Sequence, residues 1–358
     1  MSVTFNNLSD WLGNLPPMLP SFEGTKVWET VVFDQYADQI DWYNDGDSKS
    51  IIVCNSNRKF AILESVTGLV NFKIEPNFHQ IWNDDTKEFN DPLKANESLI
   101  RSNPIVLKSY WHCIQNGYIH SIFDPSAKYT DYRGNFRLRK TVYFASIASK
   151  HNILLAFLNK GENKSLIEIY SMDDHSLIQI IETNANGNHA CDFINNNAQI
   201  IVGSDEGLIR IFDTLSGELI HQLEGHEDSV LCMDVLFDES QLITASADGI
   251  WKTWNLIPGE DFGKCIHTSD LLNAKYDRKI PIYRVQYSPD GVFIFITTDI
   301  GRLMIFHREN ILLQTNIYDR YQSRRPNSDG PALISLLIDS DEKCFYVGYA
   351  NGRIQKWK

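Results

Sequence analysis

Four residues between positions 226 and 254 have the types that a nucleophilic site requires. Thr244 could supply a hydroxyl nucleophile, His226 a general base, and Asp248 the carboxylate that orients the imidazole, while Trp254 carries an indole N–H. Such a set could catalyse acyl transfer or hydrolysis. The alternative is that the same groups hydrogen-bond to one another and only stabilise the framework.

The remaining motifs favour the structural role. The chain contains no Gly-x-Ser-x-Gly turn, no P-loop, no Gly-x-Gly-x-x-Gly fingerprint and no His-Glu-x-x-His pair. Threonine is also an uncommon nucleophile away from a chain terminus. We therefore predict no catalytic residues, no cofactor and no enzymatic activity.

Metal binding is not predicted either. Close Cys/His pairs include Cys265 with His267 and His112 with Cys113. A structural zinc ion needs four ligands at a recognisable spacing, and no second pair accompanies either of these. We interpret these thiols and imidazoles as core residues.

The segment that must position the four residues recurs along the chain. Its second half, "DGIWKTW" at 248–254, has counterparts in "EGLIRIF" at 206–212, "IGRLMIF" at 300–306 and "NGRIQKW" at 351–357. Three weaker copies bring the number of units to seven, spaced 42 to 59 residues apart. The second position of the copies is occupied by Arg58, Gly117, Ser165, Gly207, Gly249, Gly301 and Gly352. Glycine there indicates a tight turn with positive φ.

Short apolar or alternating runs, bounded by turn residues, fill each unit. In the fifth unit they are "SVLCMDVLF", "QLITAS", "IWKTWNL" and "KCIHTS". Runs of this length predict an all-β fold with four antiparallel strands per unit. Seven such sheets arranged radially form a seven-bladed β-propeller, in which each sheet is covered by its neighbours.

The frame from Gly225-His226 to Trp254-Asn255, together with "YSPDG" at 287–291, resembles the WD-repeat family. The resemblance extends over about residues 26–358, although only the fifth unit matches well and no Trp-Asp pair occurs. It implies that His226, Thr244, Asp248 and Trp254 form a structural hydrogen-bond network. The other units lack the full set, and we expect them to depend on apolar packing.

The predicted domain organisation is an N-terminal extension, residues 1–25, followed by the propeller, residues 26–358. The segment "KVWETVVF" at 26–33 is rich in β-formers, whereas the last unit ends after its third strand. We expect residues 26–33 to complete the last blade and to close the ring without exposed edges. The predicted blades are 36–77, 78–135, 141–183, 185–224, 225–270, 280–320 and 330–358 with 26–33.

Composition indicates the cellular context. The formal net charge of −13 disfavours direct nucleic-acid binding, although local basic segments leave it open. The six cysteines form no Cys-x-x-Cys pair, which is typical of reduced thiols in a cytoplasmic or nuclear protein. The chain contains no run of 18 apolar residues, so we expect no membrane span, and the N-terminus does not look like a secretory signal.

The resemblance implies a protein–protein interaction scaffold, a subunit of an intracellular multiprotein complex that binds other protein subunits. Basic segments at 132–140 and 319–326, on one rim of the ring, could bind acidic peptides. The candidate partner-binding residues are Tyr283, Arg284, Arg324, Arg325, Arg137, Arg139, Trp11, Leu12 and Leu15.

Two other classes of function occur among propellers. Substrate receptors of ubiquitin ligases often have an Arg two residues after a Trp-Asp pair, but this chain has Leu215 and Ile257 there. Some propellers are hydrolases, with convergent His and carboxylate side chains at the mouth of the central channel. The sequence cannot show such convergence, so this alternative stays open here.

Overall fold

The structure is a computed structural model, and its regular elements are all β-strands among the residues that it describes. These residues are 25–34, 36–37, 39–44, 49–54, 60–74, 82–83, 88–89, 142–147, 154–160, 165–171, 177–270, 279–318, 331–339 and 341–358. Within them the strands form six four-stranded antiparallel sheets and one two-stranded hairpin. The all-β prediction is therefore confirmed.

Each four-stranded sheet is a meander of sequential strands, apart from the sheet that joins the two ends of the chain. The first three meander sheets have the following bounds: β2 (Gln39–Asn44), β3 (Lys49–Cys54), β4 (Phe60–Glu64), β5 (Val70–Ile74); β8 (Val142–Ile147), β9 (Leu154–Lys160), β10 (Ser165–Ser171), β11 (Leu177–Glu182); β12 (Asn188–Ile194), β13 (Gln199–Ser204), β14 (Ile209–Asp213), β15 (Leu219–Leu223). The remaining sheets have these bounds: β16 (Val230–Val235), β17 (Gln241–Ser246), β18 (Trp251–Asn255), β19 (Cys265–Thr268); β20 (Ile282–Tyr287), β21 (Phe293–Thr298), β22 (Arg302–His307), β23 (Leu312–Tyr318); β24 (Leu333–Asp339), β25 (Cys344–Tyr349), β26 (Arg353–Trp357) with β1 (Lys26–Val31).

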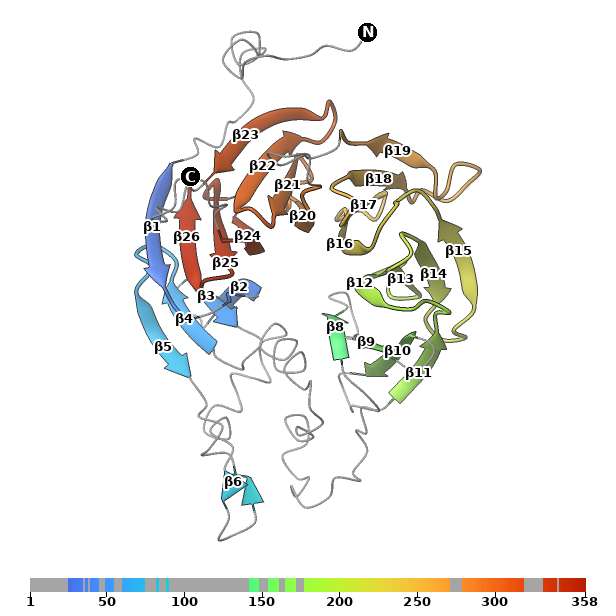
Figure 1. Cartoon of the computed structure of the whole chain (residues 1–358), viewed down its shortest axis with the longest axis horizontal. Coiled ribbons are helices and arrows are strands. Elements are labelled where there is room, and N and C mark those ends of the chain that lie inside the picture. The colour runs from blue at the N-terminus through green and yellow to red at the C-terminus, as the bar shows by residue number, and fades with distance from the viewer. Residues whose placement is uncertain are drawn as a thin grey trace.

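The sheets follow one another around a centre, with β2, β8, β12, β16, β20 and β24 innermost (Figure 1). Buried side chains form clusters between successive sheets rather than inside one sheet. One cluster joins Ile201 and Ile211 to Trp254, and the next joins Trp251 to Ile282 and Ile296. Each sheet therefore depends on its neighbours to exclude water from its two faces.

The two ends of the chain share one sheet. Strand β1 pairs antiparallel with β26, with Val31 opposite Arg353 and Trp28 opposite Lys356. The backbones of Thr25 and Lys358 exchange two hydrogen bonds of 2.9 Å. The expected pairing of the N-terminal segment with the last blade is thus present, but the strand ends at Val31, two residues earlier than predicted.

Positive φ is confirmed at four of the five glycines that the repeat singled out, and the fifth, Gly117, lies outside the described residues. Gly207, Gly249, Gly301 and Gly352 have φ values of +77°, +81°, +76° and +75°. Two of them also need the space: a Cβ on Gly207 would overlap the carbonyl oxygen of His226, and one on Gly352 would overlap that of Phe33. Glycine here therefore serves both the turn and the close approach of the next unit.

The second predicted blade, 78–135, falls almost wholly outside the described residues. Only the hairpin of β6 (Trp82–Asn83) and β7 (Glu88–Phe89) is described there. The described part of the chain contains no helix of the length and apolarity that a membrane span requires.

Candidate functional site

The four residues with catalytic side-chain types come from two strands and two connecting segments of one sheet. His226 lies in the loop before β16, Thr244 on β17, Asp248 in the β17–β18 turn and Trp254 on β18. The turn is built locally: Asp248 Oδ1 accepts a hydrogen bond of 2.8 Å from the backbone N–H of Ile250. Short side-chain-to-backbone bonds of this kind set the direction of an Asp side chain.

The structure brings the four side chains into one hydrogen-bonded chain. Trp254 Nε1 donates to Thr244 Oγ1 over 2.8 Å, and Thr244 Oγ1 lies 2.9 Å from His226 Nε2. His226 Nδ1 lies 3.1 Å from Asp248 Oδ2. Since the indole only donates and the carboxylate only accepts, the bonds run in one direction. The Thr244 hydroxyl therefore donates to His226 Nε2, and His226 Nδ1–H donates to Asp248.

Asp248 is ionised despite its burial. Burial favours the neutral acid, but the hydrogen bonds from His226 and from the backbone N–H groups of Glu227 and Ile250 outweigh it and lower the pKa of Asp248. The carboxylate thus accepts three hydrogen bonds and joins the loop before β16 to the β17–β18 turn.

This arrangement cannot present a nucleophile to a substrate. Thr244 is 0% exposed, and the side chains of His226 and Asp248 are 0% and 1% exposed. A nucleophile must contact the reacting carbon, and its base must exchange protons with the reactants. What the network can do is hold the loop, β17 and β18 in one geometry.

Comparison with known proteins agrees with this geometry. The family model for the WD domain, G-beta repeat, matches residues 217–255, which include all four side chains of the network. This match and the four-stranded antiparallel sheets together support a WD-repeat β-propeller family for the chain. A search of curated proteins found no match. WD-repeat domains in general are non-catalytic interaction modules.

The last sheet of this WD-repeat protein has a polar network of its own, which corrects the expectation of apolar packing alone. Gln355, which is 0% exposed, accepts hydrogen bonds from Tyr349 Oη over 2.6 Å and from Trp357 Nε1 over 2.9 Å. Its Nε2 donates to Glu29 Oε2 over 2.7 Å. The network thus joins β25 and β26 to β1. Sequence reasoning missed Gln355, although a Gln two residues before the strand-ending Trp was a possible signal.

The WD-repeat sheet of β12–β15 has Val202, Glu206 and Phe212 where the fifth unit has Thr, Asp and Trp. Val202 and Phe212 are buried in the cluster that this sheet shares with β10. Here the expected apolar packing is what the structure shows.

Polar side chains also link the innermost strands of neighbouring sheets. Asp234 Oδ2 on β16 accepts a 2.7 Å hydrogen bond from the backbone N–H of Tyr287 on β20. Arg284 Nε on β20 donates over 3.1 Å to the carbonyl oxygen of Ile334 on β24. Burial, followed by the charge of Asp192, raises the pKa of Asp234 to about 8. Asp234 was not singled out from the sequence, because its partner lies 53 residues away.

Arg284 therefore has a partner within the WD-repeat fold, whereas Tyr283 beside it is 39% exposed. The other predicted partner-binding residues lie outside the described residues: Arg324, Arg325, Arg137, Arg139, Trp11, Leu12 and Leu15. Leu215 and Ile257, at the two positions where ubiquitin-ligase receptors often have Arg, are 73% and 57% exposed.

One group of side chains in the described residues has a donor set that could hold a metal ion. Ligand atoms of Asp339, Glu342 and Cys344 lie within 4.8 Å of one another. Lysines already pair with both acids: Lys49 Nζ bonds Asp339, and Lys356 Nζ lies 3.1 Å from Glu342. Burial also raises the pKa of the Cys344 thiol, which disfavours the thiolate that metals bind. The group is better explained as two ion pairs, one between neighbouring sheets (Lys49 with Asp339) and one within the last sheet (Lys356 with Glu342).

Proposed function

We propose that this WD-repeat protein is a rigid, non-catalytic scaffold, a subunit of a multiprotein complex that binds its protein partners through the loops and turns of a seven-bladed propeller. One observation carries the proposal. The side chains with catalytic types in the best-matched repeat are buried and bonded to one another, so the surface that remains for function is made of turns and loops.

Seven blades are proposed on the spacing of the units. Six four-stranded sheets are described, and the interval between β5 and β8 contains the unit around Gly117 together with the β6–β7 hairpin. A seventh sheet from residues 78–135 would occupy this interval. The pairing of β1 with β26 supports a ring that its two chain ends close, since it removes the free edge of β26.

An intracellular location, cytoplasmic or nuclear, is part of the proposal. The four cysteines in the described residues, Cys191, Cys232, Cys265 and Cys344, are free thiols. Free thiols of which most are buried are typical of reducing compartments.

Affinity purification from cells, followed by size-exclusion chromatography and mass spectrometry, tests the scaffold function. A scaffold subunit should elute with a constant set of proteins at fixed stoichiometry, well above its own mass of 41.1 kDa. The matched control is Thr244→Val, which should lose partners only in proportion to the loss of folded protein. Elution as an isolated chain under all conditions would contradict the proposal.

A further inference from the structure

Three exposed apolar side chains lie on the turns at one end of the sheets. In a four-stranded meander, the turn between strands one and two and the turn between strands three and four lie at the same end. We call this end, for the sheets β12–β15, β16–β19 and β20–β23, the turn face: residues 195–198, 213–218, 236–240, 256–264, 288–292 and 307–311. On it Leu215 is 73% exposed, Phe237 62% and Ile257 57%.

The turns are joined into one continuous surface by short contacts. Within the sheet β12–β15 the backbone N–H of Thr214 donates to Ala198 O, and within the sheet β16–β19 that of Leu256 donates to Ser240 O, both over 2.9 Å. Between these sheets, Asn195 N donates to Glu239 Oε2 over 2.7 Å. Leu215 follows Thr214 and Ile257 follows Leu256, so both side chains project from backbone that hydrogen bonds hold in place.

Phe237 extends the surface toward β20–β23. Its ring lies against the turn before β21, where an ideal Cβ on Gly291 would be 3.0 Å from the Phe237 ring. Arg308 Nε holds that turn by donating to Gly291 O over 2.6 Å. The aromatic ring is therefore supported on one side and open to solvent on the other.

Leu215 and Ile257 do not serve the interior. Thr214 and Leu256 are 1% and 5% exposed and fill the interior, whereas Leu215 and Ile257 come one residue later and point away from it. Contiguous exposed apolar surface on a monomer marks a binding site.

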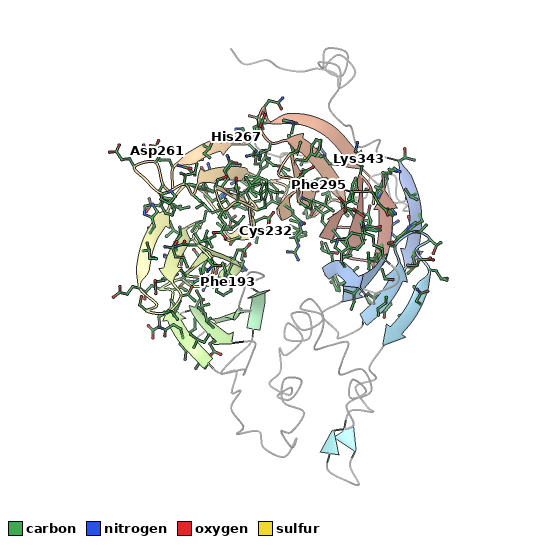
Figure 2. All side chains as sticks on the ribbon, turned by 180° about the vertical axis from the view of Figure 1, so that it is seen from behind. Phe193, Cys232, Asp261, His267, Phe295 and Lys343 are labelled. Atoms are coloured by element: carbon green, nitrogen blue, oxygen red, sulfur yellow. The ribbon has the colours of Figure 1, made fainter. Side chains whose placement is uncertain are left out.

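Acidic side chains surround the apolar ones. Glu218, Asp238, Glu260 and Asp290 are exposed on the same turns. Asp238 stays ionised because hydrogen bonds from the side chain and backbone of Ser240 lower its pKa. Lys264, the exposed cation of the β18–β19 loop, is paired with Asp261 at the outer edge of that loop (Figure 2). Arg308, the other cation of the turn face, donates to Gly291 O and interacts with Asp238, so the exposed carboxylates outnumber the cations and favour a partner that carries positive charge.

We propose that the turn face binds a protein segment in which apolar side chains alternate with Lys or Arg. The apolar side chains of the segment cover Leu215, Phe237 and Ile257, and its cations lie over the surrounding carboxylates. The inference rests on the scaffold function proposed above and names the surface and the chemistry of the partner.

The test is selection of peptides from a random dodecapeptide phage library on the immobilised full-length protein. We expect the wild type to enrich peptides that combine Leu, Ile, Phe or Trp with Lys or Arg. The variant L215S/F237S/I257S should lower that enrichment at least tenfold with an unchanged melting temperature. The matched control is V31S/I266S, which removes two apolar side chains that are 66% and 53% exposed on the outer strands β1 and β19; it should keep the enrichment.

A second variant tests the charges without touching the apolar residues. E218K/E260K changes two exposed carboxylates of the turn face. It should weaken binding of a synthetic copy of the best peptide at least tenfold at low salt and much less at high salt.

Four outcomes would overturn the proposal. They are enrichment of acidic or uncharged peptides, enrichment that the triple variant keeps, no enrichment at all, and enrichment only after deletion of residues 1–24, which would assign the face to the chain's own N-terminus. Each leaves the scaffold function itself to the co-purification experiment, so failure of this inference and failure of the proposed function are distinguishable.

Discussion

Thr244→Val isolates the hydroxyl at the centre of the buried network. Valine has nearly the same shape as threonine, so the substitution leaves packing almost unchanged and removes one oxygen. That oxygen accepts from Trp254 Nε1 at 2.8 Å and lies 2.9 Å from His226 Nε2. Both partners are buried, and in the variant each has lost its bond.

The magnitude follows from the number of orphaned groups. A buried donor or acceptor without a partner costs about 1–3 kcal/mol. Two such groups, partly offset by the more favourable burial of a methyl group, destabilise the protein by about 2–4 kcal/mol. Thr244→Ser keeps the hydroxyl and removes one methyl group, so it should cost about 1 kcal/mol.

Urea denaturation followed by tryptophan fluorescence measures both free energies of unfolding. We expect the valine variant to unfold at a clearly lower urea concentration than the serine variant, with unchanged slope. If the two variants were equally stable, or if the valine variant matched the wild type, the hydroxyl would not serve the framework and the reasoning would fail.

Three further predictions concern other contacts. The pKa of Asp234 is raised to about 8 by burial and by Asp192, so the folded protein holds a proton that the unfolded chain releases near pH 4. The stabilisation from this proton is fully present below about pH 4 and is lost as the pH rises through about 8. The free energy of unfolding of the wild type, measured by urea titrations at each pH, should therefore decline by on the order of 2 kcal/mol between pH 6 and 9, and Asp234→Asn should abolish this decline. Gly352→Ala, which adds a Cβ that overlaps Phe33 O at a φ of +75°, should lower the melting temperature in calorimetry by several degrees, whereas the same change at Gly259, with no atom within 4 Å of an added Cβ, should cost less. Gln355→Leu leaves Glu29, Tyr349 and Trp357 without this buried partner and should speed hydrogen exchange of the β1 amides far more than those of β17, an effect that a uniform loss of stability would not produce.

Local patterns made much of the architecture predictable. The turn glycines, the short apolar runs and the four polar residues of the fifth unit lie within one contiguous segment, and hairpin pairing brings such residues together without help from the rest of the chain. The Thr244–Trp254 contact spans ten residues of sequence. A repeat of similar length then predicts that neighbouring sheets cover one another.

Long-range partners were not predictable in the same way. Gln355 and Glu29 are 326 residues apart, and although residues 26–33 were expected to pair with the last unit, the register that sets Glu29 opposite Gln355 is not visible in the sequence. The acidic character of Asp234 is likewise visible in the sequence, but its raised pKa results from burial between β16 and β20.

The sequence by itself determined the strand pattern, the positive-φ turns and the polar set of the best-matched repeat, because each depends on residues close in the chain. Only the tertiary structure decided which polar groups bond across sheets, and that Leu215, Phe237 and Ile257 are exposed on turns at the same end of their sheets. Burial and exposure are properties of how separate sheets pack, and residues in different sheets have no fixed spacing in sequence.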